Sequence, residues 1–133
     1  MILVWLFERF CMFWGRLKGW KVHSIIPESG VKKGVVIVAP HTSNWDYIYG
    51  MGVKIKHNMK ATYFAKKELF KFPMKTILEK TGALPIDRSK KKNMVAQVVD
   101  WVNKADEMYI VIEPEGTRKR VDKWKAGFYH IAL

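Results

Sequence analysis

The sequence predicts an α/β fold in which helices flank a mainly parallel central sheet. Short apolar runs rich in β-branched residues alternate with segments that carry apolar residues at helical spacing, as is typical of such sheets. Residues suited to chemistry follow directly after several of these runs, where open α/β sheets place their sites. At 133 residues, 49% of them hydrophobic, the chain is long enough for one modest core.

The first predicted strand covers residues 34–39, which read Gly-Val-Val-Ile-Val-Ala. A continuous β-branched run of this kind is typical of a strand buried on both faces, and Pro40 ends it. A helix is expected to begin at Ser43 or Asn44, because either residue can cap it, and to run toward Lys54.

The remaining elements continue the alternation. Pro73 is expected to bend the helix that contains it, and Gly82 to close that helix as a C-cap. In chain order we predict a strand over 61–65, a helix over 68–80, a strand over 83–86, a helix over 93–104 with Val95, Val98, Val99 and Val102 on one face, and a strand over 108–112.

The N-terminal segment, residues 1–26, is predicted to lead into the α/β domain of residues 27–133 through a helix lying in a membrane interface. Its uninterrupted apolar run is far shorter than the roughly 20 residues that span a bilayer, and nothing marks a cleavable signal peptide. The alternative is a core helix of a soluble domain. On a helix, Leu3, Leu6, Phe7, Phe10 and Trp14 share one stripe, and Arg16, Lys18 and Lys21 follow it, near lipid phosphates.

The charge balance predicts a polyanionic partner. The chain has 24 Lys and Arg residues against 12 Asp and Glu, which gives a net charge of +12. Nucleic acid, anionic lipid headgroups and an acidic substrate all fit this charge. The aromatic content of 14% favours the lipid interface. Nucleic acid is the least favoured partner, because the basic residues are dispersed and no recognised module is present.

A disulfide framework and a metal site are not expected. Cys11 is the single cysteine, so neither an internal disulfide nor a Cys-based zinc site can form, and a reducing, cytoplasmic setting fits. The histidines His23, His57 and His130 lack the spacing of metal ligands. The sequence also contains no phosphate-binding glycine loop and no serine-hydrolase elbow.

His41 and Asp46 are the candidate catalytic pair. On a continuous helix a separation of five residues would place them about 140° apart. If His41 instead lies in the corner between strand and helix, the first helical turn can bring the Asp46 carboxylate to the imidazole. That carboxylate would fix the tautomer and leave the other ring nitrogen as a general base. The alternative is a His–Asp hydrogen bond that only holds a loop.

Other candidates follow the later strands. In residues 113–118, Gly116 permits unusual backbone angles, Thr117 offers a hydroxyl, and Arg118 presents a planar fork suited to phosphate. The alternatives are a charged surface turn here, a surface ion pair at Asp87 and Arg88, and solvated lysines at Lys66 and Lys67.

Together these segments resemble the glycerolipid acyltransferases of the 1-acylglycerol-3-phosphate acyltransferase (PlsC-type) family. The resemblance covers about residues 34–130 and rests on three blocks in the family's order. They are His-x-x-x-x-Asp at 41–46, Gly-Ala-Leu-Pro-Ile-Asp-Arg at 82–88, and Pro-Glu-Gly-Thr-Arg at 114–118. Each block alone is modest, but the three together are highly specific.

The resemblance implies roles for individual residues. His41 would act as the base on an acceptor hydroxyl, with Asp46 orienting it, and the hydroxyl would attack an acyl thioester directly. The implied donor is acyl-CoA or acyl-carrier protein, with no cofactor and no metal. The acceptor would be a lysophospholipid, above all 1-acylglycerol 3-phosphate, or else glycerol 3-phosphate or a lyso-aminolipid. Its phosphate would be held by Lys67, Arg88 and Arg118, in a pocket shaped by Glu115, Gly116 and Thr117.

Two further expectations concern the context of the chain. The protein is expected at the cytoplasmic face of a membrane, as a peripheral or monotopic protein; a non-catalytic protein that binds anionic membranes remains the alternative. The family's fourth block should follow a helix that begins near Gly127, and the sequence stops at Leu133. The α/β domain is therefore expected to be incomplete at the C-terminus, with weakened folding or activity.

Overall fold

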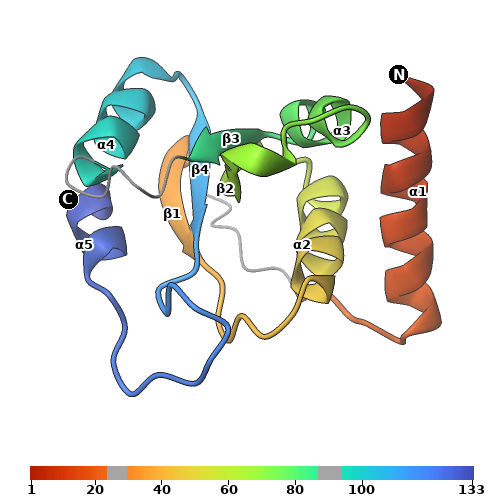
Figure 1. Cartoon of the computed structure of the whole chain (residues 1–133), viewed down its shortest axis with the longest axis horizontal. Helices are drawn as coiled ribbons and strands as arrows, with labels where there is room; N and C mark the ends of the chain where they lie inside the picture. The colour runs from red at the N-terminus through yellow and green to blue at the C-terminus, as the bar shows by residue number, and fades with distance from the viewer. Residues whose placement is uncertain (24–29, 87–93) are drawn as a thin grey trace.

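Four parallel strands form one sheet in the computed structural model of the chain, which describes residues 1–23, 30–86 and 94–133 (Figure 1). Every pairing in this sheet is parallel, so the predicted α/β class with a parallel sheet is confirmed. The strands are β1 (Lys33–Ile37), β2 (Ala61–Lys66), β3 (Ala83–Ile86) and β4 (Met108–Ile112), in the spatial order β1-β4-β2-β3.

Helices cover both faces of the sheet, as parallel strands require for their crossover connections (Figure 1). On one side, α1 (Ile2–Leu17) packs against α2 (Trp45–Lys56) and α3 (Met74–Lys80); on the other, α4 (Met94–Lys104) packs against α5 (Gly127–Ala132). The valine face predicted for residues 93–104 lies on α4 and points to the core, where Val98 is fully buried.

The deepest strand is β4, and the burial predicted for residues 34–39 is wrong. β4 lies between β1 and β2, and its Ile110 is 0% exposed. The β-branched run instead forms β1, which ends at Ile37 and is only half-buried at its centre. Among the described residues, β1 pairs with β4 alone. An edge strand has no neighbouring strand on its outer side, so its apolar composition does not guarantee burial on both faces.

The helix predicted over 68–80 is two separate elements. A short 3₁₀ turn covers Lys67–Leu69, and α3 begins only at Met74, directly after Pro73. Proline has no N–H to donate and disfavours helical angles in the residue before it, so it begins a helix here instead of bending one. The predicted closure is confirmed: Gly82 has φ +90° and donates its N–H to the Glu79 carbonyl at 3.2 Å.

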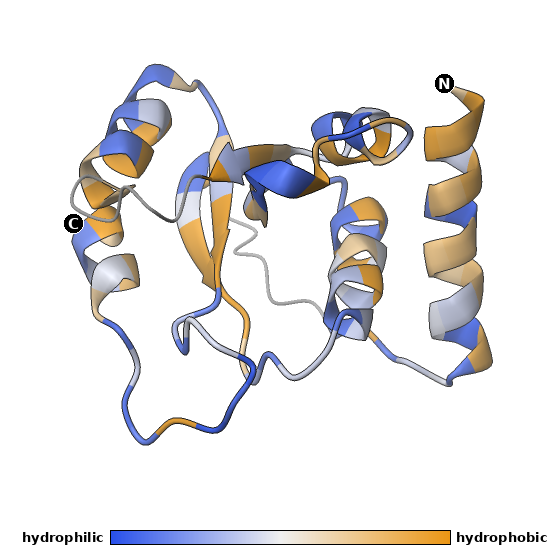
Figure 2. Ribbon diagram, in the orientation of Figure 1, coloured by the Kyte–Doolittle hydropathy of each residue, from blue (hydrophilic) through white to orange (hydrophobic). Residues whose placement is uncertain are grey.

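The apolar stripe predicted on α1 is divided between two environments. Its inner part packs on α2: Phe7 stacks on Tyr47 and Trp14 on Trp45, beside the buried Cys11. Figure 2 shows that apolar residues extend well beyond this contact around α1. The outer face carries large apolar residues that are 43–64% exposed, namely Leu3, Leu6, Phe10, Phe13 and Leu17. Among the helices of the described ranges, none is long and apolar enough to cross a membrane.

A buried polar cluster fixes α2 against β2 and α3. The hydroxyl of Thr81, whose residue is 1% exposed, lies 3.1 Å from the Tyr47 hydroxyl and 2.8 Å from that of Tyr63, and the two phenols are 2.7 Å apart. Thr81 also donates to the Ile77 carbonyl at 2.7 Å. Burial raises the pKa of Tyr47 and Tyr63 above the ordinary range, so both phenols stay neutral. We call Tyr47, Tyr63 and Thr81 the Thr81 cluster.

Candidate active site

The corner between β1 and α2 places His41 and Asp46 together. His41 follows β1 by four residues, and Asp46 is the second residue of α2. The Asp46 Oδ2 atom accepts hydrogen bonds from the N–H groups of Thr42 (2.8 Å) and Ser43 (3.0 Å), which turns the carboxylate back over the corner. Partial burial opposes ionisation, but these two hydrogen bonds and the neighbouring His41 lower the pKa of Asp46 below its ordinary value. The carboxylate is therefore ionised at neutral pH.

Two carboxylates face the Nδ1 atom of His41. Asp46 Oδ2 lies 3.1 Å from Nδ1, and Glu113 Oε1 lies 3.4 Å from it. Both distances are those of ion pairs, but neither contact has the alignment of a hydrogen bond, so within the described ranges the buried Nδ1 has no aligned acceptor. A small rotation of the ring would give Nδ1–H a carboxylate acceptor on either side. Glu113 lies in the candidate segment 113–118, but the sequence assigned a role only to the later residues of that segment.

The opposite ring nitrogen faces Arg118. The Arg118 Nε–H points at His41 Nε2 over 3.4 Å, and the Nη2 group donates to the side-chain oxygen of Asn44. Guanidinium nitrogens only donate, so Nε2 must carry the lone pair and the ring proton lies on Nδ1. This is the tautomer that a general base needs. Asn44 was considered only as a helix cap, yet its side chain makes no cap hydrogen bond and holds Arg118 instead.

The adjacency of β1 and β4 brings the two segments together. Ile37 and Ile112 are in register at the carboxyl ends of these strands, so residues 38–46 and 113–118 leave the sheet side by side (Figure 1). Glu115 anchors the contact by accepting the His41 backbone N–H at 2.7 Å. Of the predicted site residues, the structure thus joins His41, Asp46, Glu115 and Arg118.

The turn around Gly116 has the unusual backbone that the sequence predicted. Gly116 has φ +64°, and a Cβ atom there would lie 2.6 Å from the amino group of Lys125. The Lys125 backbone N–H also donates to the Pro114 carbonyl at 2.9 Å. This close approach brings the amino group of Lys125 to the turn at Gly116, a cation that the motif did not reveal. The Thr117 hydroxyl accepts from the Lys119 N–H at 3.3 Å, so it shapes the turn.

The two other predicted phosphate ligands are not joined to this group. Lys67 follows β2, which is separated from β1 by β4, and it is exposed in the 3₁₀ turn with no contact to His41 or Arg118. Two strand spacings correspond to about 10 Å. Asp87 and Arg88 lie outside the described residues, so the role expected of Arg88 stays a prediction.

A comparison with known protein families identifies the family of the chain. The family model described as Acyltransferase matches residues 21–133. The chain belongs to the acyltransferase family. Its PlsC-type resemblance is thus confirmed at the level of the family, and the match includes every residue of the His41 corner and of the loop after β4. No curated protein and no solved structure gives a significant match to the chain.

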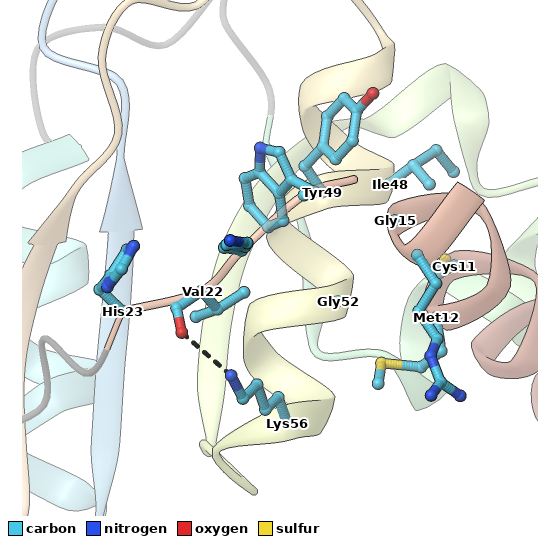
Figure 3. A pocket seen from close by; sticks show the side chains of 12 residues that line it. Cys11, Met12, Gly15, Val22, His23, Ile48, Tyr49, Gly52 and Lys56 are labelled. Atoms are coloured by element: carbon cyan, nitrogen blue, oxygen red, sulfur yellow. Dashed lines mark hydrogen bonds between the residues drawn. The ribbon is translucent and has the colours of Figure 1, made fainter. Parts of the chain in front are cut away.

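A groove of about 510 Å³ lies between α1, residues 20–23 and α2 (Figure 3). Apolar and aromatic side chains such as Met12, Ile48 and Tyr49 line it, and on α2 it begins two residues after Asp46. A Cβ atom built on Gly52 meets no atom within 4 Å, so this glycine leaves open space. Three basic residues, Arg16, Lys21 and Lys56, complete the lining, which contains no carboxylate.

Proposed function

We propose that the chain transfers a fatty acyl group from acyl-CoA or acyl-carrier protein to the hydroxyl of a lysophospholipid, above all 1-acylglycerol 3-phosphate, in phospholipid synthesis. One observation carries this proposal: His41 presents the lone pair of Nε2, while two carboxylates face Nδ1, beside a guanidinium suited to phosphate. Membership of the acyltransferase family supports the reaction class.

The reaction follows from these groups. His41 Nε2 takes the proton of the acceptor hydroxyl as its oxygen bonds to the thioester carbonyl carbon. Asp46 and Glu113 stabilise the imidazolium that forms. Collapse of the tetrahedral intermediate breaks the carbon–sulfur bond, and the departing thiolate takes the proton from His41. The products are an ester and a free thiol.

Direct attack fits the nucleophiles that the chain offers. Cys11 is 2% exposed, and burial raises its pKa to about 11, so it carries almost no thiolate at neutral pH. The Ser43 hydroxyl accepts from the Trp45 N–H at 3.2 Å, and within the described ranges no hydrogen bond joins His41 to a hydroxyl or thiol. These contacts support acyl transfer without an acyl-enzyme.

A panel of donors and acceptors tests the proposal. Purified protein is given acyl-CoA or acyl-carrier protein with 1-acylglycerol 3-phosphate, glycerol 3-phosphate or a lyso-aminolipid, and both ester product and released thiol are measured. We expect His41→Ala to lower kcat by about 10²–10⁴-fold. The matched control is His130→Ala, on an exposed part of α5, which should retain activity. Vesicle binding without thiol release from any donor would instead establish the non-catalytic alternative.

We further propose that the protein lies on the cytoplasmic face of a membrane through the outer face of α1. The exposed side chains Leu6, Phe10 and Phe13 would enter the acyl region, and Arg16 and Lys18 would reach anionic headgroups. Leu6→Glu with Phe13→Glu should abolish flotation with anionic vesicles. Equal flotation of this variant and the wild type would contradict the assignment.

The groove between α1 and α2 is proposed to hold a substrate acyl chain. Its apolar lining suits hydrocarbon, and its basic residues suit the anionic end of a lipid. Gly52→Leu should lower kcat/KM for long-chain substrates more than for short-chain ones. Gly50→Leu, an equal change at an exposed position of α2, should leave that ratio unchanged.

A further inference from the structure

We propose that Arg118 is a phosphate-operated cover on the catalytic base. Without a phosphate, its guanidinium occupies the lone pair of His41 Nε2; a phosphate monoester on the acceptor draws it away. The inference rests on the proposed function, because it concerns the same base and the same acceptor. It goes further by making phosphate recognition a condition for base catalysis.

The first support is the position of the guanidinium. Arg118 Nε lies 3.4 Å from His41 Nε2 and points its N–H at the lone pair that must receive the acceptor's proton. A hydroxyl cannot donate to the same lone pair while this contact persists. The positive charge also disfavours the imidazolium that forms during the reaction. In this arrangement the lone pair that the base needs is occupied.

The second support is the difference in anchoring along the loop. Pro114 is buried, and Glu115 is tied to the His41 backbone N–H at 2.7 Å. Beyond Gly116, which has φ +64°, Arg118 is exposed, and its guanidinium contacts only His41 and Asn44 within the described ranges. An exposed guanidinium held by two polar contacts can exchange both for a bidentate phosphate without disturbing the anchored part of the loop.

Asn44 is the positioning residue of this cover. Its side-chain oxygen accepts from Arg118 Nη2, so the guanidinium bridges α2 and the imidazole. Lys125, whose amino group lies against Gly116, adds a second cation that favours a phosphate near the displaced guanidinium. The arrangement would keep water, which has no phosphate, from using the base to hydrolyse the thioester.

The test supplies the lipid part of the acceptor and its phosphate part as separate molecules, 1-acylglycerol and inorganic phosphite. Acylation of 1-acylglycerol, which lacks the phosphate, is measured with and without inorganic phosphite. We expect phosphite to accelerate the wild type at least about tenfold. Arg118→Ala should raise the phosphite-free rate roughly three- to tenfold, the factor that one ordinary hydrogen bond accounts for, and should abolish the phosphite effect. Asn44→Ala should raise the phosphite-free rate by a smaller factor.

The matched control is Arg120→Ala, which removes the same charge from an exposed position of the same loop and should not raise the rate. A phosphite-free rate in Arg118→Ala equal to or below that of the wild type overturns the cover, as does a wild type that phosphite does not accelerate. Circular dichroism of both Arg118→Ala and Arg118→Lys verifies folding. Failure of the wild type to acylate 1-acylglycerol 3-phosphate overturns the proposed function as well, whereas normal acylation of that lipid confines the failure to the cover.

Discussion

Helix α2 contributes residues to two sets of polar contacts, the corner around His41 and the Thr81 cluster, which differ in their burial. At its N-terminal end, Asp46 and Asn44 belong to an exposed corner whose contacts reach His41 and Arg118 across loops. The next residue, Tyr47, belongs to the Thr81 cluster, whose three hydroxyl groups hydrogen-bond to one another away from the corner. Exposed polar contacts contribute little to stability, whereas a buried group that loses its partner is costly. We therefore expect substitutions in the corner to change activity and those around the cluster to change stability.

The largest expected effect is on activity, at the corner. Asp46→Asn keeps the size of the side chain but removes the charge that stabilises the imidazolium, so kcat should fall by about 10²–10⁴-fold. The melting temperature should fall by only a few degrees, because the carboxylate is partly exposed. Initial rates and thermal unfolding of the same preparation measure both quantities. If the rate fell only in proportion to the fraction of folded protein, the corner and the Thr81 cluster would not differ in the way we expect.

The sequence predicts the helices and strands better than it predicts which of them lie side by side. Alternating patterns identify all four strands and the parallel class, because period and composition are local properties. The order β1-β4-β2-β3 is not local, and it alone puts His41 beside residues 113–118 and leaves Lys67 two strands away. The motif blocks named His41, Asp46 and Arg118 without their contacts. Glu113 and Asn44 carried no signal of their own, since only proximity to His41 and Arg118 reveals them.

The Thr81 cluster is a second set of contacts that the sequence does not predict. Tyr47, Tyr63 and Thr81 are 16 and 18 residues apart and belong to α2, β2 and the end of α3. No periodicity links such positions, so the sequence alone does not predict their contact. Edge and central strands of a parallel sheet are also alike in composition, which is why the burial of residues 34–39 was overestimated.

Gly82, next to Thr81, should give the largest effect on stability. A Cβ atom there would lie 2.6 Å from the Ala61 carbonyl oxygen and 2.9 Å from the Lys54 amino group, at φ +90°. Gly82→Ala should therefore destabilise the fold by about 2–4 kcal/mol, combining backbone strain with a backbone clash. Gly50→Ala, at an open helical position, should instead stabilise it by about 1 kcal/mol. Urea unfolding measures the change in the free energy of unfolding for both variants. Changes of the same sign would contradict the backbone geometry described for Gly82 and Gly50.

Thr81→Val should have the next largest effect. The change keeps the shape of the buried side chain but removes the hydroxyl that the two partly buried phenols share, at a cost of about 1–3 kcal/mol. Thr62→Val makes the same change on β2, where the described residues show no side-chain hydrogen bond to lose, and should cost less than half as much. Well below the melting temperature, kcat and KM should be unaltered in both variants. A lowered kcat in Thr81→Val alone would show that the cluster also positions the corner.

The smallest effect expected is the pH dependence of the stability that Asp46 contributes. The hydrogen bonds from Ser43 and Thr42, with His41 beside them, lower the pKa of Asp46 in the folded state below the value of about 3.9 in an unfolded chain. A lowered pKa means that the unfolded chain binds the proton more tightly, so acid favours unfolding. The contribution is therefore complete above about pH 4 and is lost as the pH falls through the lower pKa of the folded state. The difference in unfolding free energy between the wild type and Asp46→Asn should shrink over that range. Urea midpoints at a series of pH values test this, and a difference that widens toward acid would mean that the corner does not stabilise the ionised carboxylate.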